Sequence, residues 1–285
     1  MGVLVVGCGF LGRKVGRLWL KDGISTHCIT RSTERSKTFA DAGYLPLVAD
    51  ITMPESLAKS KLTDVQTVLF SVGFDRIRYQ DIREVYVVGL KNVLEWLPKS
   101  IQQFIYVSST GVYGNCDGEW IDESSPTDPQ RPGGRACLEA ETLIRESWIA
   151  DKATILRLAG IYGPNRIPRL DAIRNQQWES LGQSGHINLI HVDDAAGIIC
   201  DLAQQKIVNE LFLVSDGNPP KRTEFYEFIA DVIGTGPIDW SVAEDPKSGR
   251  RASADKKVSN RKLAQRIAFQ YSYPDFRSGI RHALA

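Results

Sequence analysis

The sequence predicts an α/β fold, a doubly wound parallel sheet with a smaller C-terminal lobe. Short apolar segments alternate with amphipathic helical patterns over residues 1–164, which is typical of parallel strands covered by helices. The first apolar segment, residues 3–6, ends in glycines spaced G-x-G-x-x-G and leads directly into a helical pattern. Polar or glycine-containing turns follow the apolar segments, and open α/β sheets bind their ligands beyond these strand ends. Together these observations indicate a Rossmann domain.

The composition narrows the class of protein further. The chain has 285 residues, of which 42% are hydrophobic and 24% charged, and its formal net charge is +1. This near-neutral charge argues against nucleic-acid binding, and no apolar run approaches the ~20 residues of a membrane span. The five cysteines are scattered, so we expect reduced thiols and a cytoplasmic protein. Cysteine and histidine spacing predicts no metal site.

The order of the elements follows from their periodicity. The predicted strands of the main sheet are residues 3–6, 24–29, 45–49, 65–72, 104–107 and 153–158. The helices predicted between them include residues 13–20, 54–61, 78–97 and 135–149. Further along, strands are expected at 187–191 and 210–214, and helices at 193–203, 223–233 and 277–284.

The alternation of predicted strands and helices becomes less regular after residue 163. Residues 187–203 are expected to return to the main sheet, so the dinucleotide-binding Rossmann domain would comprise residues 1–164 and 187–203. The remaining segments, 165–186 and 204–285, are expected to form the smaller substrate-binding lobe.

The glycine-rich turn predicts a dinucleotide site, and each glycine has a mechanical task. Gly7 permits the tight turn, Gly9 lets a pyrophosphate approach the backbone, and Gly12 lets the helix pack against the strand. Phe10 and Leu11 complete the loop at the helix N-terminus, whose N–H groups suit phosphate. A tight turn without a ligand is the alternative.

The end of the second strand indicates which dinucleotide is preferred. Proteins that bind NAD place an acidic residue there to bind the ribose 2′-hydroxyl. Here Arg31 and Ser32 occupy that place, and Arg35 follows one turn later. A guanidinium binds two phosphate oxygens at once and stays charged, so NADP is predicted over NAD. The alternative is that Arg31 is a solvated surface residue and both cofactors bind.

Several further segments resemble the extended short-chain dehydrogenase/reductase family, in its NAD-dependent epimerase/dehydratase branch. These segments are Gly7–Gly12, Asp50-Ile51, Val85–Leu94, Ser108–Gly114, Asp122-Glu123 with Pro126, Leu156–Pro164, His191–Asp194 and Lys262-Leu263. They lie in the family's order over nearly the whole chain.

The resemblance implies roles for individual residues. Asp50 and Ile51 would hold the adenine, and Ser71, Val72 and Gly73 would pass under the adenine ribose. Ser109 falls at the family's catalytic Ser or Thr, and Tyr162 falls on the loop near the nicotinamide. Thr110 and Gly111 stand where the dehydratases keep an Asp–Glu pair, so elimination by that pair is not expected.

The chain departs from the family at its catalytic Tyr-x-x-x-Lys pair. None of the nine tyrosines is followed by a lysine four residues later. Gly133 takes the place of the tyrosine and Cys137 that of the lysine, which resembles the family's atypical subgroup. Tyr113 is a candidate substitute proton donor, although its family counterpart is structural.

Three other residues are candidates for a catalytic or substrate-binding role. Arg135 could replace the charge of the lysine, or it is a solvated residue at the helix start. Cys137 could be a nucleophile, but a small apolar core residue is the expected reading. His191 precedes a helix N-cap and is expected to be structural, with substrate contact as the alternative.

Two functions from different classes remain open. The first is an NAD(P)-dependent oxidoreductase that acts on a carbonyl or secondary alcohol of a small molecule, with a nucleotide sugar as one candidate. The alternative is a catalytically silent NADP(H) sensor or regulatory module. The resemblance also implies a homodimer, formed through residues 78–97 and the helix after Gly134.

Overall fold

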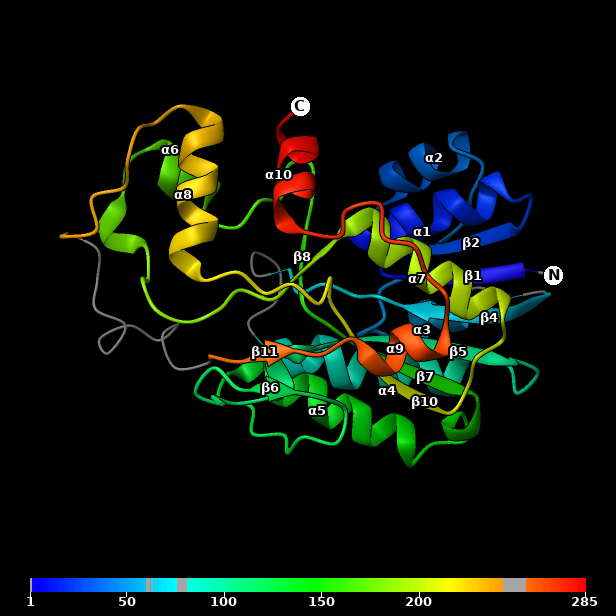
Figure 1. Ribbon diagram of the computed structural model, residues 1–285. Coiled ribbons are helices and arrows are strands. Elements are labelled where there is room, and N and C mark those ends of the chain that lie inside the picture. Colours follow the sequence, from blue (N-terminus) through cyan, green and yellow to red (C-terminus); the bar gives the residue numbers. More distant parts are fainter. Residues whose placement is uncertain (1, 60–61, 63, 76–80, 243–254) are drawn as a thin grey trace. The chain divides into compact units, whose positions relative to one another are not determined.

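A seven-stranded sheet forms the centre of the fold. The computed structural model describes residues 2–59, 62, 64–75, 81–242 and 255–285. The sheet has the strand order β10-β7-β5-β4-β1-β2-β3 (Figure 1). Its strands are β1 (Gly2–Val6), β2 (Ser25–Thr30), β3 (Leu45–Val48), β4 (Val65–Phe70), β5 (Gln103–Ser109), β7 (Ala153–Leu158) and β10 (Glu210–Val214).

The strand order confirms the predicted doubly wound sheet. Strand β1 pairs in parallel with both β2 and β4, and the pairs β2–β3 and β4–β5 are also parallel. The chain therefore winds outward from β1 in one direction and then returns to wind in the other. This reversal next to β1 is the point at which Rossmann sheets bind their ligands.

Helices connect the strands. They are α1 (Phe10–Lys21), α2 (Thr33–Asp41), α3 (Pro54–Ala58), α4 (Gly89–Trp96), α5 (Pro132–Arg145) and α7 (Val192–Gln204). A π-helical turn, η1 (Glu84–Val88), precedes α4. Of the helix predicted over 78–97, residues 78–80 lie outside the described residues, and so do residues 60–61 of the helix predicted over 54–61.

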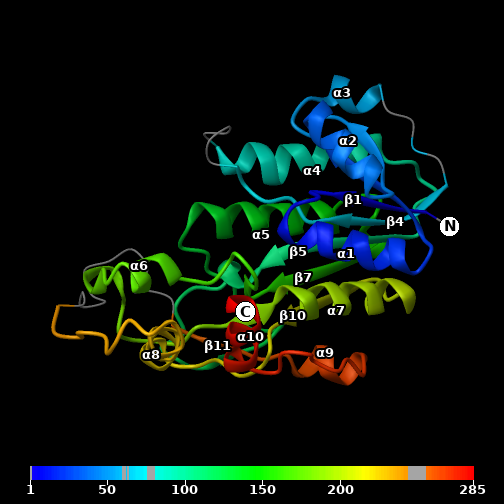
Figure 2. The same cartoon turned by 90° about the horizontal axis from the view of Figure 1, so that it is seen from above.

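Strand β1 at the centre of the sheet is buried on both faces, in keeping with its continuously apolar sequence, whereas the edge strand β3 is only partly buried. Leu4 and Val6 of β1 belong to a core that includes side chains of α3, α4 and α5. Val5 points to the other face, where it lies against Gly12 of α1. Figure 2 shows α4 and α5 on one side of the strands and α7 on the other.

The chain divides into two compact units. Unit 1 comprises residues 1–112, 129–157 and 195–212, and unit 2 comprises 113–128, 158–194 and 213–285. This division differs from the sequence-based one at residues 158–164, 187–194 and 204–212. The longest difference is at residues 113–128, which the sequence analysis assigned to the dinucleotide-binding domain.

Two sets of contacts inside unit 2 account for that difference. The ammonium group of buried Lys256 donates to the carbonyls of Tyr113 and Gly114, at 3.2 and 3.3 Å. The short strand β6 (Trp120–Ile121) also pairs in parallel with β11 (Lys257–Val258). Both sets join the loop to residues more than a hundred positions later, which periodicity does not reveal.

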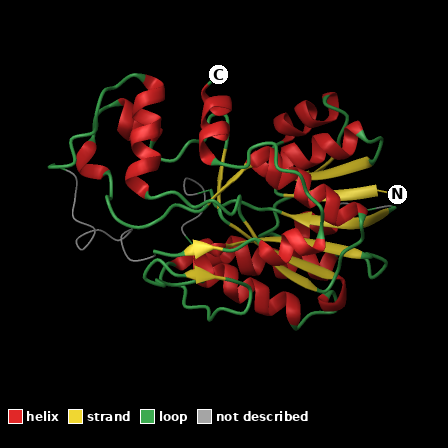
Figure 3. Ribbon diagram, viewed as in Figure 1, coloured by secondary structure: helices red, strands yellow, loops and turns green. Residues whose placement is uncertain are grey.

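Unit 2 contains a second strand pair. Strand β8 (Gly160–Tyr162) pairs in parallel with β9 (Leu189–His191), and this pair, like the β6–β11 pair drawn as two neighbouring arrows in Figure 3, is not part of the main sheet. The expectation that residues 187–203 return to the main sheet is therefore wrong for the strand. Instead β10, which was expected in the lobe, forms an edge of the main sheet. The other helices after β8 are α6 (Leu170–Arg174), α8 (Arg222–Ile233), α9 (Arg261–Arg266) and α10 (Phe276–Leu284).

Among the described residues, no helix combines enough length with enough apolar character to cross a bilayer.

Candidate cofactor-binding and active site

A pocket in unit 1 lies at the carboxyl ends of the strands next to the reversal point. Residues that follow β1, β2, β3 and β4 line it, so four separate loops converge there. The lining residues are Val6, Gly7, Cys8, Gly9, Ile29, Thr30, Arg31, Arg35, Ala49, Asp50, Ile51, Val72, Gly73 and Val85. Eight of the residues that the sequence analysis assigned to the cofactor are among them.

The three glycines of the turn differ in their surroundings. Gly7 has a φ of +92°, and a Cβ there would lie 2.6 Å from the backbone of Ser71. A Cβ on Gly12 would lie 2.3 Å from the carbonyl oxygen of Gly7, so α1 packs directly on the turn. A Cβ on Gly9 would meet nothing within 4 Å, which leaves open space beside the backbone in the pocket.

Helix α1 presents its N-terminus at this turn. Its N-cap is Gly9, which supplies no side chain to accept hydrogen bonds from the first turn. The first turn carries no acidic residue, so the positive end of the helix dipole is not neutralised locally. Backbone N–H groups at such a terminus suit a phosphate ligand. Leu11, in the first turn of α1, is buried.

Two arginines lie at the end of β2. Arg31 Nη2 donates to Asp75 Oδ2 at 2.9 Å, and both side chains are about one-third exposed. Arg35 Nη2 donates to the Cys8 carbonyl at 3.4 Å, across the pocket from its own helix α2. Ser32 serves as the N-cap of α2 and accepts from the Arg35 N–H. Two guanidinium groups therefore line this part of the pocket.

The floor of the pocket after β3 is held by hydrogen bonds. Asp50 Oδ1 accepts from the backbone N–H and the hydroxyl of Thr52, at 3.0 and 2.8 Å. The carbonyl of Ile51 accepts from Asn92 Nδ2 at 2.8 Å in a buried position. Ser71 does not line the pocket, because its hydroxyl donates to the Gly7 carbonyl at 3.0 Å. Ser71 thus fixes the turn rather than the pocket wall.

Sequence reasoning missed several parts of this site. Asn92 gave no signal, since a polar residue in an amphipathic helix usually faces solvent. Cys8 occupies a position of the G-x-G-x-x-G motif at which any residue is allowed, so the motif assigned it no role, yet it lines the pocket. A hydrogen bond with the thiol of Cys28 lowers the Cys8 pKa, and the charges of Arg13 and Arg35 act in the same direction.

Ser109 ends β5 at the same edge of the sheet. Its Oγ accepts a hydrogen bond from the Gly111 N–H at 3.0 Å, which leaves the hydroxyl proton directed elsewhere. A Cβ on Gly134 would lie 2.1 Å from the Gly111 carbonyl, so α5 begins in direct contact with the turn after Ser109. A Cβ on Gly133 would contact only Ile82 Cδ1, at 3.4 Å. Space for a Cβ atom therefore exists at position 133 but not at position 134.

A buried ion network lies behind this turn. Glu141 is fully buried, and Arg157 binds it through two hydrogen bonds of 2.9 and 2.7 Å. The Ser108 hydroxyl donates to the same carboxylate at 2.6 Å, and Arg145 adds a bond of 3.1 Å. Breaking a buried pair of this kind typically costs about 3–5 kcal/mol. The network therefore fixes the position of Ser108, the neighbour of Ser109.

Cys137 lies on the inner face of α5. Burial raises the pKa of its thiol to about 12, and the charge of Glu141 acts in the same direction. The cysteine is 5% exposed and packs among core residues. A nucleophilic cysteine needs an electropositive and partly exposed setting, which is absent here. This environment favours the structural reading of Cys137.

The two other catalytic substitutes make backbone contacts. Tyr113 is buried in unit 2, and its hydroxyl donates to the Asp122 carbonyl at 2.9 Å. Arg135 is exposed at the start of α5 in unit 1, where its Nη1 donates to the Gln130 carbonyl at 3.0 Å. Tyr113 thus has a structural hydrogen bond, in a different unit from Ser109.

Tyr162 and His191 both belong to unit 2. Tyr162 is fully buried, its hydroxyl donates to the Asp275 carbonyl at 3.4 Å, and burial raises its pKa. His191 is fully buried beside it, with ring centroids 5.2 Å apart. The structure therefore places Tyr162 on strand β8, where the sequence analysis expected a loop.

The strand order, the glycine turn and the pocket define a Rossmann-type dinucleotide-binding fold. The model of the NAD dependent epimerase/dehydratase family matches residues 3–214. The chain therefore belongs to that family, as its sequence motifs indicated.

Individual relatives agree with this assignment. A candidate NAD-dependent epimerase/dehydratase from Methylobacillus flagellatus has a solved structure with 32% identity and a TM-score of 0.77, over 99% of this chain and 97% of that one. Protein YeeZ of Escherichia coli K12 is 26% identical over 280 residues, which cover 96% of each protein.

A more distant relative shares the fold. DesIV, a dTDP-glucose 4,6-dehydratase from Streptomyces venezuelae, was solved as a double mutant with NAD and DAU bound. Its TM-score is 0.82 at 18% identity, over 100% of this chain and 96% of that one.

Proposed function

We propose that the protein is an NADP(H)-dependent oxidoreductase that acts on a carbonyl or secondary alcohol of a small molecule. The observation that carries this proposal is the pocket at the strand ends, with Arg31 and Arg35 where NAD-binding relatives would need an acid. Family membership and a structural relative with bound NAD support a nicotinamide cofactor. The phosphorylated form is our inference from the two guanidinium groups.

The residues present fit such a cofactor. The N-terminus of α1 and open Gly9 would receive the pyrophosphate, and Asp50 with Ile51 would border the adenine. Arg31 would exchange Asp75 for the 2′-phosphate, which gives it two charges to bind in place of one. The bound nicotinamide would supply a hydride acceptor or donor.

Ser109 would orient the reacting oxygen of the substrate. Its Oγ already accepts from Gly111 N–H, so its own proton is available to donate to that oxygen. General acid–base groups contribute about 10²- to 10⁴-fold to such reactions. A protein that lacks the family's tyrosine and lysine would therefore react slowly and depend on water or another group for the proton.

Direct titration tests the cofactor assignment. NADPH and NADH are titrated into the protein by calorimetry, and NADPH is expected to bind more tightly. A tenfold preference for NADH would overturn the NADP assignment, and no binding of either would overturn the proposal.

Turnover tests the chemistry. Loss of the 340-nm absorbance of NADPH is followed with a panel of carbonyl compounds and nucleotide sugars. Ser109→Ala is expected to reduce any activity at least tenfold. Thr142→Ala is the matched control, because it removes an exposed hydroxyl of α5 that donates to the Leu138 carbonyl, and it is expected to leave the activity unchanged. Activity unchanged within twofold in Ser109→Ala would show that Ser109 does not orient the oxygen.

A second candidate function is an NADP(H) sensor without turnover. The buried position of Cys137, at the family's lysine place, favours this alternative, because no charged group replaces the lysine there. Tight NADPH binding with no turnover across the panel would support the sensor.

We also propose a homodimer formed through α4 and α5, as the family resemblance implies. Arg83, which precedes η1, pairs with Glu139 of α5 on the surface of unit 1, so the two segments present one joint face. Light scattering coupled to size-exclusion chromatography would give the mass of the species in solution.

A further inference from the structure

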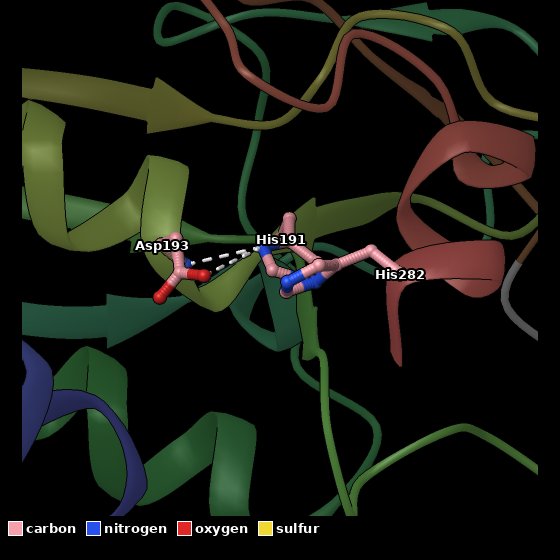
Figure 4. A group of neighbouring side chains, drawn as sticks. All are labelled: His191, Asp193 and His282. Carbon is pink, nitrogen blue, oxygen red and sulfur yellow. Dashed lines mark hydrogen bonds and ion pairs between the residues drawn. The ribbon is translucent and has the colours of Figure 1, made fainter. Parts of the chain in front are cut away.

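Three potential metal ligands come together in unit 2. His191 is the last residue of β9, Asp193 lies in the first turn of α7, and His282 lies on α10 near the end of the chain. Their ligand atoms all lie within 4.8 Å of one another (Figure 4). None of these residues belongs to the cofactor pocket of unit 1.

His191 is held in one orientation by its neighbours. Its ring is fully buried, and Tyr273 covers it with ring centroids 3.9 Å apart. Tyr162 meets it edge to face at 5.2 Å. Nδ1 accepts a hydrogen bond from the Asp193 N–H at 3.2 Å, so this nitrogen faces the start of α7. The ring is therefore preorganised, as a metal-ligating imidazole needs to be.

The spacing of the first two ligands is close to that around a metal ion. Nδ1 of His191 lies 3.7 Å from Oδ2 of Asp193. Two ligands at the ~2.0–2.1 Å of zinc bonds, set at a tetrahedral angle, lie roughly 3.3–3.4 Å apart. A shift of a few tenths of an ångström would bring Nδ1 of His191 and Oδ2 of Asp193 to this separation. Coordination of the ion by Nδ1 would then replace the 3.2 Å hydrogen bond that this nitrogen accepts.

His282 supplies the third ligand from the opposite side. Its ligand nitrogen lies within 4.8 Å of the other two ligand atoms, and its exposure leaves a path for an ion to enter. Its ring lies against His191 and Tyr273, with centroids 5.3 and 4.7 Å apart. Figure 4 shows its ring directed toward His191, and the Asp193 carboxylate on the other side of that ring.

We propose that His191, Asp193 and His282 form a binding site for a divalent transition-metal ion, with zinc as the reference ion. Two imidazoles and one carboxylate suit zinc, nickel or copper, whereas magnesium and calcium prefer oxygen ligands throughout. Three protein ligands leave a fourth position for water. The ion would join β9, α7 and α10, and this site is independent of the cofactor proposed above.

Calorimetric titration of the full-length protein with zinc chloride, after treatment with a chelator and buffer exchange, tests the site. One equivalent is expected to bind. Changes to groups that only support metal ligands cost about 10- to 100-fold in affinity, so loss of a ligand should cost at least that much. His282→Ala is the main variant, because an exposed residue can be replaced with little risk to folding.

His186→Ala provides a matched control. His186 is also a histidine paired with an aspartate in unit 2, with Nδ1 2.9 Å from Asp255 Oδ1, but it belongs to no such group of three among the described residues. This variant is expected to keep the zinc affinity of the unmodified protein. Equal zinc binding by His282→Ala and the unmodified protein would overturn the proposal, and so would the absence of binding to the unmodified protein.

Cobalt provides an independent readout of geometry. Co²⁺ in a four-coordinate site gives intense visible absorption, which is expected in the unmodified protein and lost in Asp193→Asn. Weak absorption typical of six-coordinate Co²⁺ in both proteins would show that the ion binds elsewhere, and would contradict the proposal.

Discussion

The proposed preference for NADP(H) depends on the ion pair between Arg31 and Asp75. The ion pair is one-third exposed, and exposed pairs contribute only about 0–1 kcal/mol. A 2′-phosphate can therefore displace Asp75 at small cost, since it offers Arg31 more charge and more acceptor oxygens. The carboxylate of Asp75 would then compete weakly with the 2′-phosphate for the guanidinium of Arg31.

Arg31→Ala is expected to weaken NADPH binding by about 10- to 100-fold, since a hydrogen bond to a charged group contributes about 1.5–3 kcal/mol. NADH binding should change little, because it has no 2′-phosphate. Asp75→Asn, which removes the competitor, is expected to tighten NADPH binding. Calorimetry of both variants with both cofactors measures these effects, and an equal loss for NADPH and NADH in Arg31→Ala would refute the role.

Asp216 has an unusual setting in unit 2. Its Oδ1 accepts from the Asn218 N–H at 2.9 Å, whereas Oδ2 is buried without a hydrogen-bond partner among the described residues. Burial raises the pKa of Asp216 to about 7, and the charges of Asp275 and Asp194 act in the same direction. The folded protein therefore retains this proton over a range in which the unfolded chain has lost it.

Asp216 should make the protein less stable as the pH rises from about 4 to about 7, because the folded state binds the extra proton. Asp216→Asn removes this loss. At pH 8 the free energy of unfolding of the variant is expected to be higher than that of the unmodified protein, by on the order of 2 kcal/mol. This difference in free energy should become smaller toward pH 4.

Urea unfolding at pH 5 and pH 8 measures the effect. Asp171→Asn is the control, because the Asp171 side chain is 90% exposed. A stability difference between Asp216→Asn and the unmodified protein that is the same at both pH values would exclude the titration of Asp216 as its cause.

At the level of elements, the start of α5 depends on one glycine more than on its neighbour. Gly134 has no room for a Cβ, because the Gly111 carbonyl would lie 2.1 Å away. Gly133 has room, because the nearest atom would be Ile82 Cδ1 at 3.4 Å. The close approach of α5 to the turn after Ser109 therefore requires glycine at position 134 alone.

Gly134→Ala is expected to lower the free energy of unfolding by about 1–3 kcal/mol, the usual cost of overpacking. Gly133→Ala should be neutral or stabilising by up to about 1 kcal/mol, because alanine favours helix over glycine. Chemical denaturation of the two variants measures the contrast. Equal effects at both positions would show that helix propensity, and not the contact with Gly111, governs this helix start.

The elements that could be predicted are those with local signals. Six strands of the main sheet and the glycine turn follow from periodicity and motif, so the doubly wound sheet was predicted, whereas β10 was expected in the lobe. Strand β9 has the same apolar pattern, but its partner is β8 in a separate pair. Apolarity shows that a strand is buried but does not reveal which strand pairs with it.

Residues brought together by distant elements could not be predicted for the same reason. Asn92 meets the Ile51 carbonyl, and His191 meets His282, across long stretches of sequence. The spacing rules for metal sites apply to ligands that are close together in the chain. They therefore could not relate His191 to His282. The Glu141–Arg157 network was likewise invisible, because charged residues usually indicate exposed positions.

For the whole molecule, the two proposed sites lie in different units. Every residue that lines the described cofactor pocket belongs to unit 1, whereas the histidine cluster belongs to unit 2. A ligand that binds only the folded state stabilises it by an amount set by its concentration and affinity. Stability measurements can therefore report binding at the pocket even when no substrate is known.

NADPH at a hundred times its dissociation constant is expected to raise the free energy of unfolding by about 2.7 kcal/mol. NADH at the same concentration should raise the free energy of unfolding less, because a ligand that binds more weakly stabilises the folded state less. The effect is measured by thermal unfolding at several cofactor concentrations. Arg31→Ala is the control, because NADPH and NADH are expected to raise its unfolding temperature by similar amounts. If NADPH leaves the unfolding temperature unchanged at every concentration, the pocket does not bind it, whatever activity the protein has.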